Sequence, residues 1–143
     1  MRTLLTLGFV AALTTACADD GVAGGCTAMG SPSGIDIHLD PAMVPKVDSG
    51  TFDVCWDGAC HEYAIDFNGQ PETFADVPGL PAGEVEVTVR LVDRSGAEVL
   101  DRTLSVTPVP TYPNGHSCPP DGARVLLLVD ARGALRAATP RFA

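Results

Sequence analysis

The sequence has very little positive charge. Lys46 is its only lysine, and nine basic side chains stand against 18 acidic ones, which gives a formal net charge of −9. Because a surface of this sign repels phosphate groups, nucleic acid is excluded as a partner. The same charge opposes anionic lipid, so we expect the folded domain to stand away from the membrane surface rather than lie on it.

Motifs of common enzymes are also missing. The chain has no Gly-x-Ser-x-Gly motif, phosphate-binding loop or dinucleotide fingerprint. With one Trp and two Tyr, it lacks the aromatic side chains that would support a sugar-cleaving carboxylate pair, for which Asp53 and Glu62 are the candidates. The adjacent His116 and Ser117 do not form a triad, because base and nucleophile must converge with a third group. The sequence predicts a protein that is not an enzyme and needs no cofactor, with a hydrolase as the weakest alternative.

Long hydrophobic runs are absent too. The first apolar run, Leu4–Leu13, has about ten residues, roughly half of what a membrane-spanning helix needs. It follows the positively charged Arg2 and precedes small residues, and these are the three regions of a secretory signal. We therefore expect residues 1–16 to be a signal peptide.

Cys17 comes next, and Thr14-Thr15-Ala16-Cys17 resembles the lipobox of bacterial lipoproteins. The resemblance implies that Cys17 receives a diacylglyceryl group and becomes the N-terminus. It would then anchor the protein in the cell membrane on the extracytoplasmic side. The alternative is ordinary cleavage near Ala16 or Ala18, with Cys17 lost or free. The cysteine count favours lipidation, because Cys17 is the one left over if the other four of the five cysteines pair.

Helical periodicity is missing from the rest of the chain. From Ile35 onward, short alternating apolar runs are separated by Gly, Pro, Asn and Asp. This pattern favours an all-β fold, an immunoglobulin-like antiparallel β-sandwich of about seven or eight strands in residues 34–143. Residues 17–33, rich in Gly and small side chains, are expected to form a flexible tether after the lipidated cysteine. The predicted strands are Ile35–Leu39, Thr51–Asp57, Ala59–Phe67, Glu72–Val77, Glu84–Val92, Glu98–Thr107, Arg124–Asp130 and Ala134–Ala138.

Asp57-Gly58 is a strong signal for a two-residue hairpin, because a type I′ turn needs positive φ at both central positions. In that register Cys55 and Cys60 lie opposite each other, about 4.5–5.5 Å apart at Cα, which suits a disulfide. Cys26 then pairs with Cys118. The alternative, a zinc site of four cysteines, lacks paired C-x2-C arms, and export favours oxidation.

The same register predicts the faces of the hairpin. Trp56 and His61 fall on the apolar face, where we expect Trp56 in the core and His61 as a hydrogen-bonded structural residue. Asp53 and Glu62 face each other on the opposite side. A calcium ion could bridge this like-charge pair, although a solvated surface is the more ordinary interpretation.

Asp36, His38 and Asp40 alternate along one predicted strand, so their side chains point to the same side. Carboxylate, imidazole and carboxylate at this spacing could bind a divalent cation. The more ordinary interpretation is the solvated face of an edge strand. A divalent-metal-binding envelope protein is therefore the alternative function.

The proline-rich segment Pro108–Asp121 carries Tyr112 and is either a rigid connector across one end of the sandwich or a recognition surface. Its part Pro113–Pro120 and the hairpin Val54–Cys60, together with the lipobox, resemble small secreted lipoproteins of high-GC Gram-positive bacteria that have no assigned activity. The resemblance implies an immunoglobulin-like sandwich outside the cytoplasm. We expect a membrane-anchored lipoprotein with a non-enzymatic binding or structural role at the cell envelope, whose partner is an envelope protein or another extracellular ligand.

Overall fold

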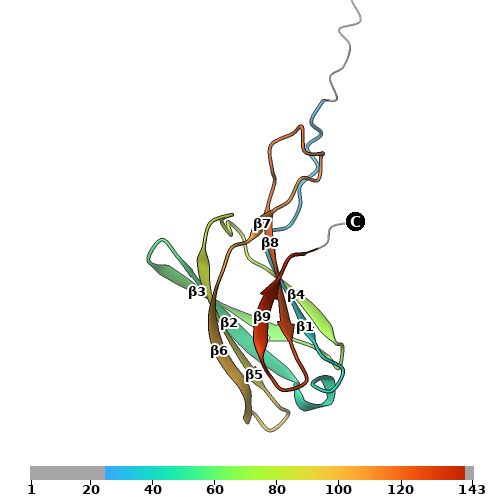
Figure 1. Ribbon diagram of the computed structural model, residues 1–143, viewed down its shortest axis with the longest axis vertical. Coiled ribbons are helices and arrows are strands. Elements are labelled where there is room, and N and C mark those ends of the chain that lie inside the picture. The colour runs from blue at the N-terminus through green and yellow to red at the C-terminus, as the bar shows by residue number, and fades with distance from the viewer. Residues whose placement is uncertain (1–24, 141–143) are drawn as a thin grey trace, which may run out of the picture.

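The computed structural model describes residues 25–140 and shows nine strands in two packed sheets (Figure 1). The predicted signal peptide, residues 1–16, and Cys17 lie outside the described residues. No helix in the described part of the chain is long and apolar enough to cross a membrane. The elements are β1 (Gly34–Leu39), the 3-10 helix η1 (Val44–Lys46), β2 (Ser49–Trp56), β3 (Ala59–Asp66), β4 (Glu72–Asp76), β5 (Val85–Val92), β6 (Glu98–Val106), β7 (Val109–Pro110), β8 (Ala123–Val129) and β9 (Leu135–Ala138).

The sheets have four and five strands, in agreement with the predicted β-sandwich. The four-stranded sheet has the order β3-β2-β5-β6 and is antiparallel throughout. The five-stranded sheet has the order β4-β1-β8-β7, and β9 also pairs with β8. β1 and β8 run parallel, so the prediction of an antiparallel sandwich is wrong for this pair. The short strand β7, which lies within the proline-rich segment, is a ninth strand, one more than the eight predicted.

The core lies between the two sheets and follows the alternation of the sequence. In β5 the apolar residues from Val85 to Leu91 are buried, whereas Glu86 and Arg90 are exposed on the outer face. Phe52 and Phe67 are among the largest fully buried side chains. β8 lies between β1 and β7 in its sheet, and Leu126 and Leu128 on its outer face are half-buried. One face of each sheet therefore packs inward, while the other meets solvent or a few half-buried apolar groups.

The hairpin of β2 and β3 confirms the predicted turn and disulfide. Asp57 and Gly58 have φ of 50° and 78°, and Cys55 is bonded to Cys60 at a Cα separation of 4.0 Å. The end of this hairpin extends beyond the other strands in Figure 1. Trp56 is consequently only half-buried, and His61 is exposed with its ring 4.9 Å from the Trp56 ring. Trp56 packs against the edge of the core, so the expectation for it holds in part. The expectation of a hydrogen-bonded structural histidine is wrong, because His61 lies at the exposed end of the hairpin.

Residues 26–33 are held to the domain by the Cys26–Cys118 bond that the sequence predicted. They run beside the loop 111–122, and we call these two segments together the stalk (Figure 1). Cys26 is bonded to Cys118, as expected, and Asn114 donates to the Met29 carbonyl at 2.9 Å. The Ser33 hydroxyl accepts the backbone N–H of Ala123, which closes the stalk at the start of β8. Residues 17–24 of the predicted tether lie outside the described residues.

Gly122 allows the two stalk segments to come close. Its φ is 89°, and a Cβ at this position would lie 2.5 Å from the Ser31 carbonyl oxygen. Thr111, the one buried polar residue of the described chain, donates its hydroxyl to the Asp121 carbonyl beside it. The stalk is thus held by backbone proximity and polar contacts as well as by its disulfide.

Removing each disulfide should destabilise the domain by a different amount. The Cys26–Cys118 bond joins residues 92 apart, whereas Cys55–Cys60 spans 5. Because the loss of chain entropy in the unfolded state grows with loop length, we expect the double Ser variant of Cys26 and Cys118 to lose about 4–5 kcal/mol. The corresponding variant of Cys55 and Cys60 should lose about 2 kcal/mol. Urea unfolding at 25 °C measures both, and the reverse order would contradict the long-range bond as the larger contribution.

Gly50 in the central strand β2 has no room for a side chain. A Cβ there would lie 2.2 Å from the Arg90 carbonyl oxygen of β5, and a backbone group of the sheet cannot move aside. We expect Gly50→Ala to lower the free energy of unfolding by about 2–3 kcal/mol. Gly83→Ala, where a Cβ would meet nothing within 4 Å, is the matched control and should stay within about 0.5 kcal/mol of the unchanged protein. If the two variants lost the same free energy of unfolding, the loss would come from replacing a glycine and not from the close contact with the Arg90 carbonyl oxygen.

Candidate functional site

The three predicted metal ligands lie in β1 and directly after it, but the structure does not bring them together. Asp36 accepts a bidentate ion pair from Arg124 of the parallel strand β8, with its shortest distance 2.7 Å. The Arg124 guanidinium also lies 4.5 Å from the centre of the Phe74 ring. The carboxylate is therefore already neutralised by a cation that comes from another strand.

His38 and Asp40 have other partners. The His38 ring nitrogen lies 3.4 Å from Glu72, its register partner on β4. Asp40 accepts the backbone N–H of Ala42 at 2.9 Å and so stabilises the turn that follows β1. Within residues 25–140, no group of three or more His, Cys, Asp or Glu side chains could hold a metal ion. The structure gives Asp36, His38 and Asp40 other partners and does not gather them into a cluster of metal ligands.

The predicted carboxylate pair Asp53 and Glu62 is in register on β2 and β3, but an arginine takes the place of the suggested cation. Arg90 of β5 binds Asp53 at 2.7 Å and also lies 3.5 Å from Asp101. Its hydrogen bond to Asp53 raises the pKa of the Arg90 guanidinium, with smaller contributions from the charges of Asp53, Asp101 and Glu62. This network lies on the exposed outer face of a sheet, where such pairs contribute little to stability. It is not a cleft for sugar hydrolysis.

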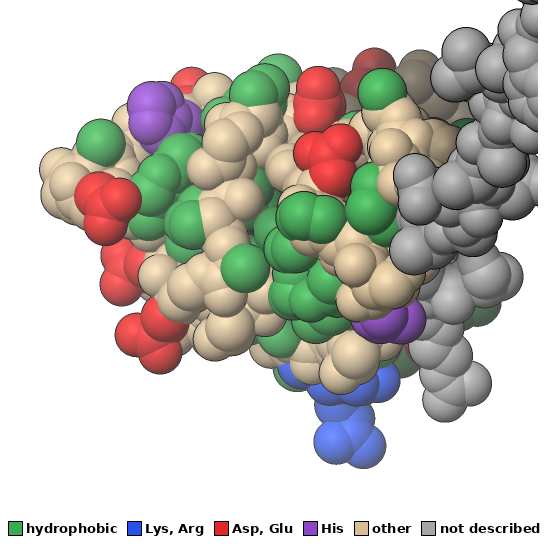
Figure 2. Space-filling view, turned by 90° about the horizontal axis from the view of Figure 1, so that it is seen from above, with side chains coloured by type: hydrophobic (Ala, Val, Ile, Leu, Met, Phe, Trp, Pro, Cys, Tyr) green, Lys and Arg blue, Asp and Glu red, His purple; other side chains and the backbone are tan. Residues whose placement is uncertain are grey.

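The stalk end of the molecule carries the other residues that the sequence singled out. Tyr112 and His116 pack their rings 4.4 Å apart within the loop, so His116 is engaged with an aromatic ring. Seen from this end, hydrophobic side chains gather across the middle of the face, and acidic side chains stand around the projecting lobe at the left (Figure 2). The loop forms part of the stalk through the Cys26–Cys118 bond.

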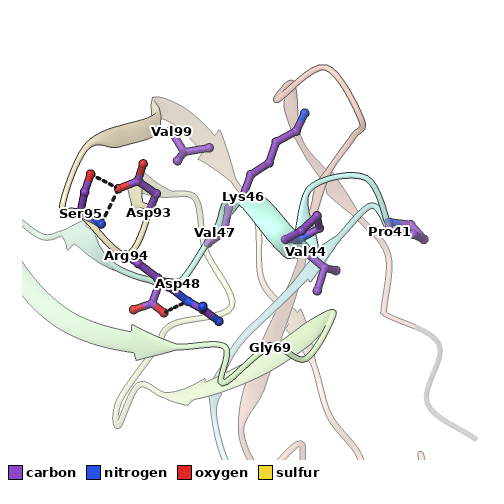
Figure 3. Close-up of a pocket in the computed structure, with 11 residues that line it drawn as sticks. Pro41, Val44, Lys46, Val47, Asp48, Gly69, Asp93, Arg94, Ser95 and Val99 are labelled. Carbon is purple, nitrogen blue, oxygen red and sulfur yellow. Dashed lines mark hydrogen bonds and ion pairs between the residues drawn. The ribbon is translucent and has the colours of Figure 1, made fainter.

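A wide pocket lies at the opposite end, among the turns farthest from the stalk (Figures 1 and 3). We call it the distal pocket. It has a volume of about 930 Å³ and opens widely to solvent. Three connections build it: residues 41–48 between β1 and β2, Gly69 between β3 and β4, and residues 93–99 from the turn into β6. Short turns from both halves of the chain thus meet around one hollow.

The distal pocket has an aliphatic floor and charged side chains at its rim. Val44 and Val99 are half-buried and pack against the core below. Lys46 extends into solvent from the short 3-10 helix (Figure 3). Arg94 is 93% exposed, and its nearest acid, Asp48, lies 3.6 Å away. At that exposure the ion pair is weak, so the guanidinium is available to another anion.

Two aspartates fix the turns at this end. Asp93 accepts from the Ser95 hydroxyl and from the backbone N–H groups of Ser95 and Ala97, and these bonds lower the pKa of its carboxyl. Asp130 accepts the N–H groups of Ala134 and Arg132 in the next hairpin, which lowers its pKa in the same way. Only the Asp93 turn lines the distal pocket. The sequence did not predict this pocket, because its lining residues carry no motif and come from three separate connections.

The chain was compared with known proteins. No family model matches it, and neither curated proteins nor solved structures show a significant similarity to it.

The lowered pKa values of Asp93 and Asp130 predict a pH-dependent stability. Since each folded pKa lies below the ordinary 3.8, the ionised carboxylate stabilises the fold fully above that value. The contribution is lost as the pH falls through the folded value. We expect Asp93→Asn and Asp130→Asn to be less stable than the unchanged protein at pH 7 and to approach it in strong acid, as measured by urea unfolding across pH.

Glu98→Gln, which removes an exposed carboxylate from the same hairpin as Asp93, is the matched control and should leave the pH profile unchanged. A stability difference that stays constant from neutral pH into strong acid would mean that the aspartate variants act through side-chain shape rather than charge.

Proposed function

We propose that this chain is an exported lipoprotein whose β-sandwich has a non-enzymatic binding role at the cell envelope, with Cys17 as its lipid anchor in the cell membrane. The observation that carries the proposal is the pairing of the cysteines. Cys26–Cys118 and Cys55–Cys60 use four of the five, so Cys17 is left for another chemistry. The lipobox, the preceding signal pattern and the resemblance to small secreted lipoproteins support the same assignment.

The stalk supports an oriented display. Because Cys26 is bonded into the stalk, only residues 18–25 lie between the proposed anchor and the folded domain. Eight flexible residues span about 15 Å on average. The domain would then stay close to the membrane with its stalk end toward it. The distal pocket, at the opposite end, would face away from the membrane (Figure 1).

We further propose that the sandwich is immunoglobulin-like. The order β6-β5-β2-β3 has the connectivity of the G-F-C-C′ sheet of a variable-type domain, and the neighbours β1 and β4 correspond to B and E. β8 occupies the place of strand A beside B, but it comes from the end of the sequence and runs parallel. This correspondence of strand order is an analogy of fold, and it assigns no function by itself.

Lipidation of Cys17 can be tested directly in bacteria that express the full chain. Cells fed an alkyne-bearing fatty acid should yield a labelled band, and Cys17→Ser should lose the label completely because no other cysteine lies in the lipobox. Mass spectrometry of the labelled protein should place Cys17 at its N-terminus.

Cys55→Ser with Cys60→Ser is the matched control, since it changes cysteines but leaves the lipobox intact, and its label should persist. A label that survives Cys17→Ser, or a mature protein that begins at another residue, would overturn the anchor.

A further inference from the structure

The distal pocket is formed by the connections β1–β2, β3–β4 and β5–β6. Under the correspondence proposed above, these are the B–C, C′–E and F–G connections. In variable domains the B–C and F–G loops meet at one end and belong to the antigen-binding surface. A volume of about 930 Å³ is in the range of pockets that hold a small molecule or a short peptide. Position and size together make this pocket the strongest candidate for the binding role.

The chemistry of the lining excludes several classes of ligand. None of the described residues that line the pocket is aromatic, so it offers no platform on which a sugar or a base could stack. Of its two carboxylates, Asp93 is bonded to its own turn, whereas Asp48 lies 3.6 Å from the exposed Arg94. A divalent cation at Asp48 would lie beside the positive charge of Arg94, which disfavours a cation at this position. What remains is an aliphatic floor beside two exposed cations.

We infer that the distal pocket binds a carboxylate carried on a short aliphatic chain. The apolar chain would lie over Val44 and Val99, which are half-buried at the floor. The carboxylate would replace Asp48 on the Arg94 guanidinium, whose planar fork suits bidentate binding. Lys46, the only lysine of the chain, adds a second positive charge at the rim. This ligand chemistry occurs in a peptide carboxyl terminus and in a free short-chain fatty acid.

The arginine of this pocket is held more loosely than the arginines on the two sheet faces. The chain is formally −9, and Arg90 and Arg124 are held in ion pairs at 2.7 Å on the sheet faces. Arg94 is held much more loosely, at 3.6 Å and 93% exposure. An anion approaching this acidic protein therefore finds an accessible pair of cations beside apolar surface at the distal pocket. The inference rests on the proposed binding role but not on the lipid anchor.

The test titrates the isotope-labelled full chain, held in a non-ionic detergent, and follows its backbone amide resonances. The probes are N-acetyl-alanyl-valine and hexanoate, each compared with its uncharged amide. We expect a carboxylate probe to shift the resonances of residues 41–48 and 93–99, and the amides to leave them unchanged. Raising the salt concentration should weaken the binding, because the cations are exposed.

Two substitutions locate the site. Arg94→Gln should raise Kd about three- to tenfold, a modest factor because the guanidinium is exposed. Arg132→Gln, which removes an exposed arginine from the β8–β9 turn outside the pocket, is the matched control and should leave Kd unchanged. Val99→Thr, similar in shape but polar, should also raise Kd if the aliphatic floor takes part.

Binding of one probe alone supports the inference and identifies the source of the carboxylate as peptide or fatty acid. The inference is overturned if neither probe shifts the pocket resonances, if the amides bind equally well, or if Arg94→Gln and Arg132→Gln have the same Kd. The fatty-acid label on Cys17 is read in a separate assay. Failure of the proposed ligand binding can therefore be told apart from failure of the proposed lipid anchor.

Discussion

The parallel pairing of β1 with β8 is the constraint on which the rest of the structure depends. A hairpin cannot join parallel neighbours, so the chain must leave the four-stranded sheet and return to β1 through a long connection. That connection supplies the loop 111–122 of the stalk, where Cys118 meets Cys26 just before β1 begins. The same pairing brings Arg124 beside Asp36. The stalk and the loss of the predicted metal site thus have a common origin.

In both candidate acidic sites, an arginine from a neighbouring strand pairs with the aspartate that was expected to bind a cation. Alternation along a strand correctly places Asp36 on a solvent-facing side and Asp53 opposite Glu62. It contains no information on which residues the adjacent strands contribute. Arg124 and Arg90 lie 88 and 37 residues away in sequence, and each reaches its aspartate only after the sheets form. An acidic cluster in a β-sequence is therefore weak support for a metal site until its neighbouring strands are known.

Local rules predicted most of the fold. The Asp57-Gly58 turn, the disulfide beside it and eight of the strands follow from residue types a few positions apart, and the structure contains them all. The predictions that were wrong depend on contacts between residues far apart in the sequence. The direction of β8 depends on a crossover, and the exposure of His61 depends on where the opposite sheet ends. The distal pocket was missed for the same reason, since its lining comes from three connections that no sequence pattern links.

The two ends of the sandwich are held by different interactions. At the stalk end a disulfide and a buried threonine fix the path of the chain toward its N-terminus. At the distal end Asp93 ties down its own turn through hydrogen bonds, while the side chain of its neighbour Arg94 stays almost fully exposed. A backbone that is already ordered loses little entropy when a ligand binds, so the cost falls on a few side chains. An ordered turn that carries an exposed charge suits the weak binding of small ligands proposed for this end of the sandwich.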